Sequence, residues 1–256
     1  KTTLTMAAAS SNSNQMKYSA ENDGLPRDAK IGILGGGQLG RMLAIAGAPM
    51  GVRLNVLDPT ESSCPASIAA EQTIGSFRDK AAVLEFAKDC DVVTVEIEHI
   101  DCDALDELVK NGIDVQPTPK TLRTIQDKYA QKVHFRDNNV KIGPFMDVPD
   151  EAQLQNAVNA FGFPLMLKSK RLAYDGRGNA VAKTASDLDN AVKSLGGFDT
   201  GLYAEKWVPF ERELAVMVAR SKSGEVVAYP VVETVHEDNI CLLYTSDAAD
   251  DTWWVC

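Results

Sequence analysis

Two stretches of the sequence carry residues whose types and spacing could bind phosphate. The first is GGGQLG at 35–40, which follows the apolar run KIGIL and fits the G-x-G-x-x-G pattern of dinucleotide-binding turns. A helix that begins at Gln38 would offer free N–H groups and a positive dipole end to an anion. Asp58 follows about 20 residues later, where nicotinamide-binding folds place the acid that binds ribose. Three interpretations stay open: a nicotinamide or flavin site, a phosphate-facing loop of another enzyme, or a structural turn.

The second stretch is PLMLKSKRLAYDGRGN at 164–179, in which Lys168 ends an apolar strand just before a basic loop. A lysine in this position can neutralise the phosphates of a nucleotide. Gly176 and Gly178 would let the loop backbone approach a ligand closely and let the loop close. The alternative interpretation is a solvated surface hairpin without a ligand.

A third stretch could complete a nucleotide site. EKWV at 205–208 ends a predicted strand beside Pro209, and its backbone could form hydrogen bonds with an adenine edge. Glu213 opens the next predicted strand, and its carboxylate could accept both ribose hydroxyls. Taken singly, Glu205 and Glu213 are of the type most often found on a protein surface.

The elements that must position these residues follow from the hydrophobic pattern. Strands at 30–34, 53–58 and 91–98 alternate with helices at 38–47, 80–88 and 103–110. In the first helix Leu39, Met42, Leu43 and Ala46 share one face. Such alternation predicts a doubly wound α/β unit with a parallel sheet. A smaller α+β unit follows, with a long helix from Lys120 to about Asn138, helices 151–161 and 186–195, strands 164–168, 180–182 and 202–208, and a hairpin that joins 212–220 to 226–233.

Composition narrows the class of protein. The chain has 256 residues, 45% of them hydrophobic, which suits one large domain or two smaller ones. Its formal net charge of -10 argues against nucleic-acid binding, and its apolar runs are too short to span a membrane. The five cysteines and three histidines lack metal-ligand spacing, so buried or free thiols in a reducing, intracellular compartment are expected.

Six stretches taken together resemble one enzyme family in order and spacing, over roughly residues 30 to 241. They are ILGGGQLGRML (33–43), DVVTVEIEHID (91–101), RTIQDKYAQK (123–132), PLMLKSKRLAYDGRGNA (164–180), YAEKWVPFERELAVMV (203–218) and YPVVETVHEDNIC (229–241). The chain resembles the N5-carboxyaminoimidazole ribonucleotide synthetases, which belong to the ATP-grasp superfamily. In plants and fungi this enzyme is the first half of phosphoribosylaminoimidazole carboxylase.

The resemblance implies an α/β fold with a Rossmann-like pre-ATP-grasp domain at 29–119 and an incomplete, α+β ATP-grasp domain at 120–240, whose lid subdomain spans about 145–205. It implies that the glycine turn helps to form a substrate site and binds no nicotinamide. The activity implied is ATP-dependent carboxylation of 5-aminoimidazole ribonucleotide by bicarbonate, through carboxyphosphate and with Mg²⁺, in purine (IMP) biosynthesis. The alternatives are another ATP-grasp ligase, such as a biotin carboxylase or a formate-using transformylase, a nicotinamide-dependent oxidoreductase, and a non-catalytic truncated relative that acts by binding.

The resemblance also implies the site residues. Those expected to act in catalysis are Lys168, Tyr174 and Arg177. Those expected to face aminoimidazole ribonucleotide are Gln38, Glu96, Tyr174 and Arg177, with Glu98 as the alternative to Glu96. Those expected to contact ATP are Lys128, Lys168, Tyr174, Asp175, Gly176, Arg177, Gly178, Glu205, Lys206, Trp207, Val208, Glu213 and His236.

Both ends of the chain depart from the family pattern. Residues 1–28 are expected to form a disordered leader, and their first 20 also resemble the composition of a transit peptide, so cytoplasm and plastid stay open. Residues 241–256 are expected to be a tail outside the family, and the Mg²⁺ ligands are expected beyond the sequence. We therefore expect this chain by itself to be inactive and poorly folded after about residue 206. The parent enzyme is expected to be a dimer, with a possible C-terminal mutase domain.

Overall fold

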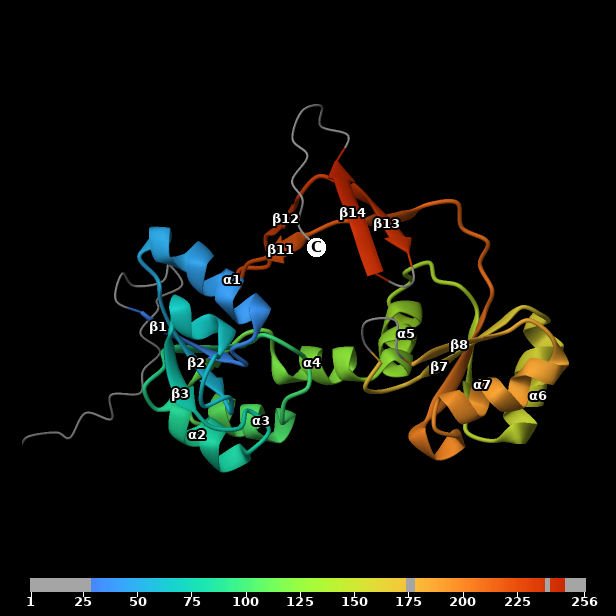
Figure 1. Cartoon of the computed structure of the whole chain (residues 1–256), viewed down its shortest axis with the longest axis horizontal. Coiled ribbons are helices and arrows are strands. Elements are labelled where there is room, and N and C mark those ends of the chain that lie inside the picture. Colours follow the sequence, from blue (N-terminus) through green and yellow to red (C-terminus); the bar gives the residue numbers. More distant parts are fainter. Residues whose placement is uncertain (1–28, 174–177, 238–239, 247–256) are drawn as a thin grey trace, which may run out of the picture. The chain divides into compact units, whose positions relative to one another are not determined.

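The computed structural model describes residues 29–173, 178–237 and 240–246, and from His236 onward it describes only the backbone (Figure 1). The expected leader, the expected tail from 247 on, and loop residues 174–177 lie outside the described residues. The described residues separate into two compact units, unit 1 up to Arg123 and unit 2 from Thr124 onward. None of the helices in the described part is long and apolar enough to cross a membrane.

Unit 1 is built on a five-stranded sheet in which every strand pair is parallel, in the order β3-β2-β1-β4-β5. Its strands are β1 (Lys30–Leu34), β2 (Arg53–Asp58), β3 (Glu71–Ile74), β4 (Val92–Val95) and β5 (Asp114–Val115). The helices are α1 (Gln38–Gly47), α2 (Lys80–Ala87) and α3 (Cys102–Lys110), with short 3-10 turns η1 (Ala48–Met50) and η2 (Pro65–Ile68). The predicted doubly wound α/β unit is confirmed. The predicted strand 91–98 is too long, because β4 ends at Val95 and residues 96–98 form bends.

The two faces of this sheet are covered by different helices. Leu34 and Leu57 pack with α2 and α3 in one buried cluster, which includes Val83 and Leu105. Ile33 and Val56 point to the other face, where they pack with Ala66 of η2. Helix α1 contacts η2 and β2; Figure 1 labels α1. Alternate residues of one strand thus fill two cores, as the period of a strand requires.

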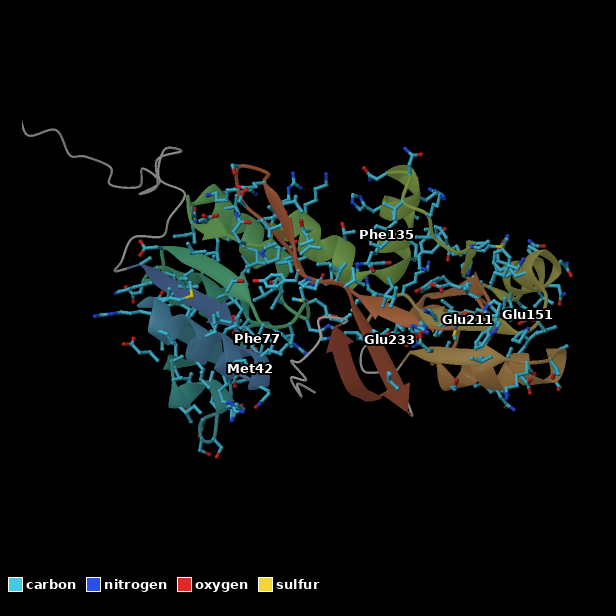
Figure 2. The ribbon with its side chains drawn as sticks, turned by 90° about the horizontal axis from the view of Figure 1, so that it is seen from above. Met42, Phe77, Phe135, Glu151, Glu211 and Glu233 are labelled. Atoms are coloured by element: carbon cyan, nitrogen blue, oxygen red, sulfur yellow. The ribbon has the colours of Figure 1, made fainter. Side chains whose placement is uncertain are left out.

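Helix α1 does not bury the face that its sequence pattern suggests. Its buried residues are Gly40 and Ala44. Leu39 is 53% exposed and Met42, which is labelled in Figure 2, is 43% exposed. The small residues allow close contact with β2 and η2, and the large apolar residues are left on the outside.

The predicted single helix from Lys120 to Asn138 is wrong. The structure has two helices here, α4 (Pro119–Gln126) and α5 (Lys128–Asp137), which are separated by Asp127. The backbone of Asp127 is extended, and its side chain accepts a hydrogen bond from the Ala130 N–H at 2.9 Å. Aspartate competes for helical N–H groups in this way, so it favours the N-cap position over a helix interior.

Unit 2 contains a four-stranded antiparallel sheet in the order β6-β9-β7-β8. Its strands are β6 (Phe145–Val148), β7 (Leu165–Ser169), β8 (Asn179–Ala182) and β9 (Leu202–Lys206). Helices α6 (Glu151–Phe161) and α7 (Leu188–Ser194), with turns η3 (Ala185–Asp187) and η4 (Phe198–Thr200), accompany it. Leu154 of α6 and Leu188 of α7 pack on the sheet face that carries Leu165, Leu167 and Leu202. The opposite face is therefore free of this core, and it carries the charged residues described below.

The remaining described strands form two further antiparallel sheets. Strands β10 (Glu213–Ala215), β13 (Val232–Glu237) and β14 (Ile240–Ser246) have the order β10-β13-β14, and β11 (Val218–Arg220) pairs with β12 (Val226–Ala228). The predicted hairpin is confirmed at 218–228, but the predicted strand 212–220 is split between two sheets. Regular strands thus occur where a poorly folded chain was expected, although several of their described apolar side chains, such as Leu214 and Val227, are exposed.

Candidate functional site

The turn after β1 holds the carboxylate of Glu96. Its Oε2 accepts a hydrogen bond from the Gly37 N–H at 2.8 Å. Its Oε1 accepts from the N–H groups of Leu39 at 3.0 Å and Gly40 at 3.1 Å. Gly35 has φ +108°, and a Cβ there would lie 2.6 Å from Oε2 of Glu96, so only glycine fits beside the carboxylate. The N-terminal end of α1 is therefore bound to an anion that belongs to the protein itself.

Asp58, at the end of β2, supports the same turn. Its Oδ2 accepts from the Gly36 N–H at 2.8 Å, and its Oδ1 accepts from the Thr60 N–H at 2.9 Å. Burial would raise the pKa of Asp58, but hydrogen bonds from Thr60 and Gly36 outweigh it and hold the pKa below its ordinary value. Both oxygens of this carboxylate thus serve the backbone, whereas a ribose-binding acid would direct them toward a ligand.

The geometry of the turn weighs against the nicotinamide interpretation. The N–H groups of Gly36, Gly37, Leu39 and Gly40 all donate to Asp58 or Glu96. A pyrophosphate would need these donors. Gln38 lies at the start of α1 with its side chain exposed, and Glu96 rather than Glu98 is the acid that contacts the turn.

The second candidate site lies on the face of the four-stranded sheet that is opposite to its apolar core. Lys168 of β7 and Glu205 of β9 both lie on this face, and Lys168 Nζ is 3.4 Å from Glu205 Oε2. Lys132 of α5 approaches the other oxygen, with 3.0 Å between its Nζ and Glu205 Oε1. The structure thus brings together two predicted residues, Lys168 and Glu205, and adds Lys132, which the sequence analysis missed.

Aromatic and ionic contacts hold α5 against this sheet. The ring of Tyr129 lies edge-on to Phe145 of β6, with 5.5 Å between their centroids, and 6.0 Å from the ring of Tyr203. Lys170 lies over the Tyr129 ring at 5.0 Å and pairs with Asp147 at 2.6 Å. The backbone N–H of Lys128 donates to the carbonyl of Lys170 at 2.7 Å. Helix α5 is therefore fixed to the sheet through several independent contacts.

Tyr203 lies beneath the charged cluster. Burial raises the pKa of its phenol well above the ordinary range, and the nearby Glu205 carboxylate, with which it shares a hydrogen bond, raises it further. The phenol consequently stays protonated and can act as a donor toward Glu205.

The loop between β7 and β8 starts and closes beside Lys168. The Ser169 N–H donates to the carbonyl of Gly178 at 2.9 Å. Gly178 has φ +81°, and a Cβ on it would lie 2.7 Å from the Cβ of Ala173, so a larger residue is excluded. Tyr174, Asp175, Gly176 and Arg177 lie outside the described residues.

The other predicted nucleotide contacts are distributed along the following chain. Lys206, Trp207 and Val208 come directly after Glu205 and are exposed. Glu213 lies on β10 and accepts a hydrogen bond from the Thr234 hydroxyl at 2.8 Å. The backbone of His236 belongs to β13, which pairs with β10 and β14, but its side chain lies outside the described part.

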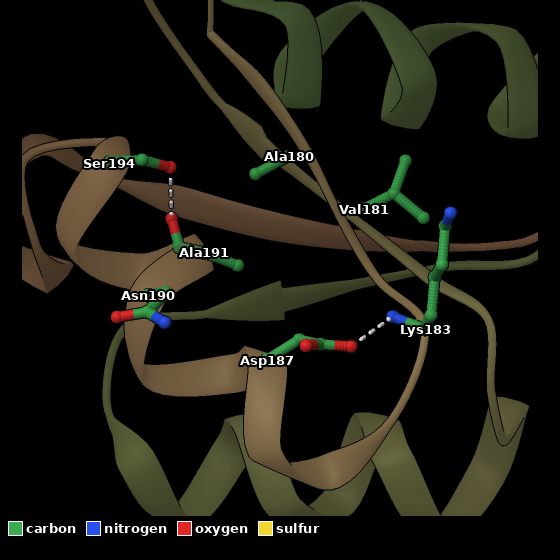
Figure 3. A pocket seen from close by; sticks show the side chains of 7 residues that line it. All are labelled: Ala180, Val181, Lys183, Asp187, Asn190, Ala191 and Ser194. Carbon is green, nitrogen blue, oxygen red and sulfur yellow. Dashed lines mark hydrogen bonds between the residues drawn. The ribbon is translucent and has the colours of Figure 1, made fainter.

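A shallow pocket elsewhere on unit 2 contains none of the predicted site residues. It is lined by Ala180, Val181, Lys183, Asp187, Asn190, Ala191 and Ser194 (Figure 3). Asp187 uses its Oδ2 for the backbone N–H groups of Lys183 and Thr184, at 3.0 and 2.8 Å. The Asp187 carboxylate therefore serves the local turn, and we assign the pocket no ligand.

The described residues also contain no group of three or more His, Cys, Asp and Glu side chains that could hold a metal ion. These residues do not by themselves supply the ligands of the Mg²⁺ that the family resemblance implies.

Comparison with known proteins matches a domain family to each of the two units. Residues 28–126 match the model of the ribonucleotide synthetase preATP-grasp domain, and residues 133–252 match that of the ATP-grasp domain. The second match runs into the segment expected to lie outside the family, and the domain boundaries inferred from the sequence stay predictions. The two matches together identify an ATP-grasp protein with its preceding domain.

The relatives narrow this class to one family. The chain is 49% identical over 220 residues to the chloroplastic phosphoribosylaminoimidazole carboxylase of Vigna aconitifolia, covering 85% of this chain and 39% of the relative. It is 36% identical to the N5-carboxyaminoimidazole ribonucleotide synthase of Synechococcus elongatus, covering 86% of this chain and 55% of the relative. The chain thus spans about two fifths of its fused relatives and just over half of this shorter one.

Solved structures with the same family name are similar to this chain in fold and in sequence. The Aspergillus clavatus carboxyaminoimidazole ribonucleotide synthase complexed with ATP matches with a TM-score of 0.79 and 42% sequence identity. The match covers 88% of this chain and 59% of the Aspergillus chain. A second structure from that organism, with ADP and 5-aminoimidazole ribonucleotide, has a TM-score of 0.78 and 40% identity, with the same coverage of both chains. The chain belongs to the N5-carboxyaminoimidazole ribonucleotide synthetase family of ATP-grasp proteins.

Proposed function

We propose that this protein acts in ATP-dependent carboxylation of 5-aminoimidazole ribonucleotide with bicarbonate, which gives N5-carboxyaminoimidazole ribonucleotide in purine biosynthesis. The observation that carries the proposal is the pair of lysines, Lys132 of α5 and Lys168 of β7, that share the Glu205 carboxylate. Solved structures of relatives hold ATP, ADP and this ribonucleotide. Two ammonium groups that share one carboxylate leave positive charge available for a polyanion.

The chemistry needs an activated carboxyl group, because bicarbonate is a poor electrophile. Transfer of the γ-phosphoryl group of ATP to a bicarbonate oxygen gives carboxyphosphate and ADP. The exocyclic amine of the ribonucleotide then attacks the carboxyl carbon, inorganic phosphate leaves, and the amine loses a proton. Phosphoryl transfer depends mainly on positioning and charge neutralisation, which we assign to Lys168 together with Arg177 and Tyr174 of the β7–β8 loop.

For the ribonucleotide we propose the turn after β1, with Gln38 and Glu96. Glu96 already accepts three backbone N–H groups. A carboxylate has about four lone-pair sites, so Glu96 can hold the turn and still accept a donor of the substrate. Gln38 is exposed beside it and offers an amide that can both donate and accept.

We carry over the remaining nucleotide contacts as proposals by resemblance: Lys128, the loop from Tyr174 to Gly178, the hinge from Glu205 to Val208, Glu213 and His236. Mg²⁺, bicarbonate, a dimeric parent enzyme and a fused mutase domain also stay proposals. The Vigna aconitifolia relative is named as chloroplastic, whereas the choice between cytoplasm and plastid stays open for this protein.

This proposal and its alternatives differ in the molecule that the site binds besides ATP: the ribonucleotide that accepts the carboxyl group, biotin, or a nicotinamide cofactor. We would titrate the 256-residue chain calorimetrically with 5-aminoimidazole ribonucleotide, with biotin and with NADH. The proposal predicts binding of the ribonucleotide alone. Binding of biotin alone would favour the biotin-carboxylase-like alternative, and binding of NADH alone would favour the oxidoreductase.

A further inference from the structure

The charges around Glu205 are unequal in a way that suggests a role for Lys132. Glu205 receives one ammonium group on each oxygen, from Lys132 at 3.0 Å and from Lys168 at 3.4 Å. All three side chains are largely shielded, since that of Glu205 is 16% exposed and those of Lys132 and Lys168 are 24% and 27% exposed. The cluster therefore has one more positive than negative charge in a place where water screens poorly.

Of its two ionic contacts, the one with Lys132 is the contact that compensates the buried Oε1 of Glu205. Oε1 of Glu205 is buried and has no aligned hydrogen bond, so its compensation is the ionic contact with Lys132 Nζ. A buried carboxylate oxygen without a compensating charge is costly. If Lys132 were absent, Glu205 would depend on Lys168 for its only ammonium partner within this trio.

The two lysines also come from different elements. Lys168 lies on β7, at the start of the loop that the proposed function assigns to the phosphates, whereas Lys132 lies on α5. Helix α5 is anchored through Tyr129 and Lys128, so Lys132 stays next to Glu205. Lys168 is the member that is placed to change partners.

We infer that Lys132 is a positioning residue for nucleotide binding, which neutralises Glu205 so that the ammonium group of Lys168 can turn to a phosphate. This inference rests on the proposed ATP site. Lys132 acts through Glu205 and does not itself touch the nucleotide. The exchange requires no covalent step, because Lys168 gives up one anionic partner and gains another while Lys132 remains.

The test measures the dissociation constant of ATP by calorimetry for the 256-residue chain and for Lys132→Gln, Lys132→Arg, Glu205→Gln and the Lys132→Gln/Glu205→Gln double variant. Lys132→Gln should weaken ATP binding at least about tenfold, because Glu205 then retains Lys168. Lys132→Arg should keep most of the affinity, since the charge remains. In the Glu205→Gln background, loss of Lys132 should have little effect, because the charge that it neutralises is already gone.

The matched control is Lys183→Gln, an exposed lysine of the same unit, which should bind ATP as the unchanged chain does. An unchanged affinity in Lys132→Gln, or an equal loss in both backgrounds, would overturn the inference, since the second result means direct contact with ATP. Absence of ATP binding in the unchanged chain would instead overturn the proposed function and this inference with it. Thermal unfolding checks that each variant is folded. If Lys132→Gln does not fold, the test uses the ATP affinities of Lys132→Arg, of Glu205→Gln and of the double variant instead.

Discussion

At the scale of single residues, Glu96 gives the glycine turn its anion. The same three N–H groups would be unsatisfied in a turn of this shape without a carboxylate or a bound phosphate. A sequence motif that is typical of dinucleotide sites thus occurs here with an internal anion. The motif predicts the conformation of the turn and leaves the identity of the anion open.

This arrangement predicts the effect of changing Glu96. Glu96→Gln keeps one acceptor oxygen but turns an amide N–H₂ toward backbone donors, so it should reduce the free energy of unfolding by about 1–3 kcal/mol. Urea denaturation measures the change, with exposed Glu85→Gln as the control. Equal stability of the two variants would mean that the Glu96 contacts contribute nothing.

Asp58 predicts a pH dependence of stability. Its pKa in the folded chain is lowered below the ordinary value of 3.8. The ionised carboxylate therefore stabilises the fold above the pKa of the unfolded chain, and this contribution is lost as the pH falls through the lower, folded pKa. Asp58→Asn should lose that part of the pH dependence, which urea titrations between about pH 5 and pH 2 would measure. A variant whose stability falls with pH as steeply as in the unchanged chain would contradict the assignment.

At the scale of elements, the break between α4 and α5 sets the residue at which the helix that carries Lys132 begins. Asp127 makes the break as the N-cap of α5. Asp127→Ala should cost about 0.5–2 kcal/mol and speed amide exchange in the first turn of α5. Asp127→Asn is the matched control, because asparagine caps about as well. If Asp127→Ala exchanged no faster than Asp127→Asn, the cap would have no role.

How far the sequence predicts these elements depends on what determines each one. The alternating strands and helices of unit 1 follow from local hydrophobic period, so the parallel sheet could be predicted. The Asp127 break could not, because the apolar spacing of Leu122, Ile125 and Tyr129 continues through it. The exposed face of α1 was missed because the pattern does not say which side meets the sheet.

In the candidate sites, too, some residues could be predicted from the sequence and others required the structure. Lys168 could be found because it stands at a strand end before a glycine-bearing loop. Lys132 looks like any surface lysine of a helix, and only the pairing of α5 with β9 gives it a role. The signal that could have found it is its four-residue spacing from Lys128, which puts both lysines on one side of α5. Glu96 was chosen by resemblance, but its three backbone partners required the structure.

At the scale of the whole molecule, the chain comprises two family domains that lie in separate compact units. Unit 1 offers a turn closed by its own carboxylates, and unit 2 offers a sheet face with surplus positive charge. Each feature lies within one unit, so each can be tested by ligand binding without reference to how the units are arranged. The central claim is that the second feature is a nucleotide site.

The most direct test of that claim is the affinity of the 256-residue chain for ATP, measured by calorimetry beside Lys168→Gln and the exposed control Lys183→Gln. We predict that the chain and the control bind ATP and that Lys168→Gln binds it at least about tenfold more weakly, because a phosphate loses its ammonium partner. ATP binding that is equal in all three chains, or absent from the unchanged chain, would contradict the account.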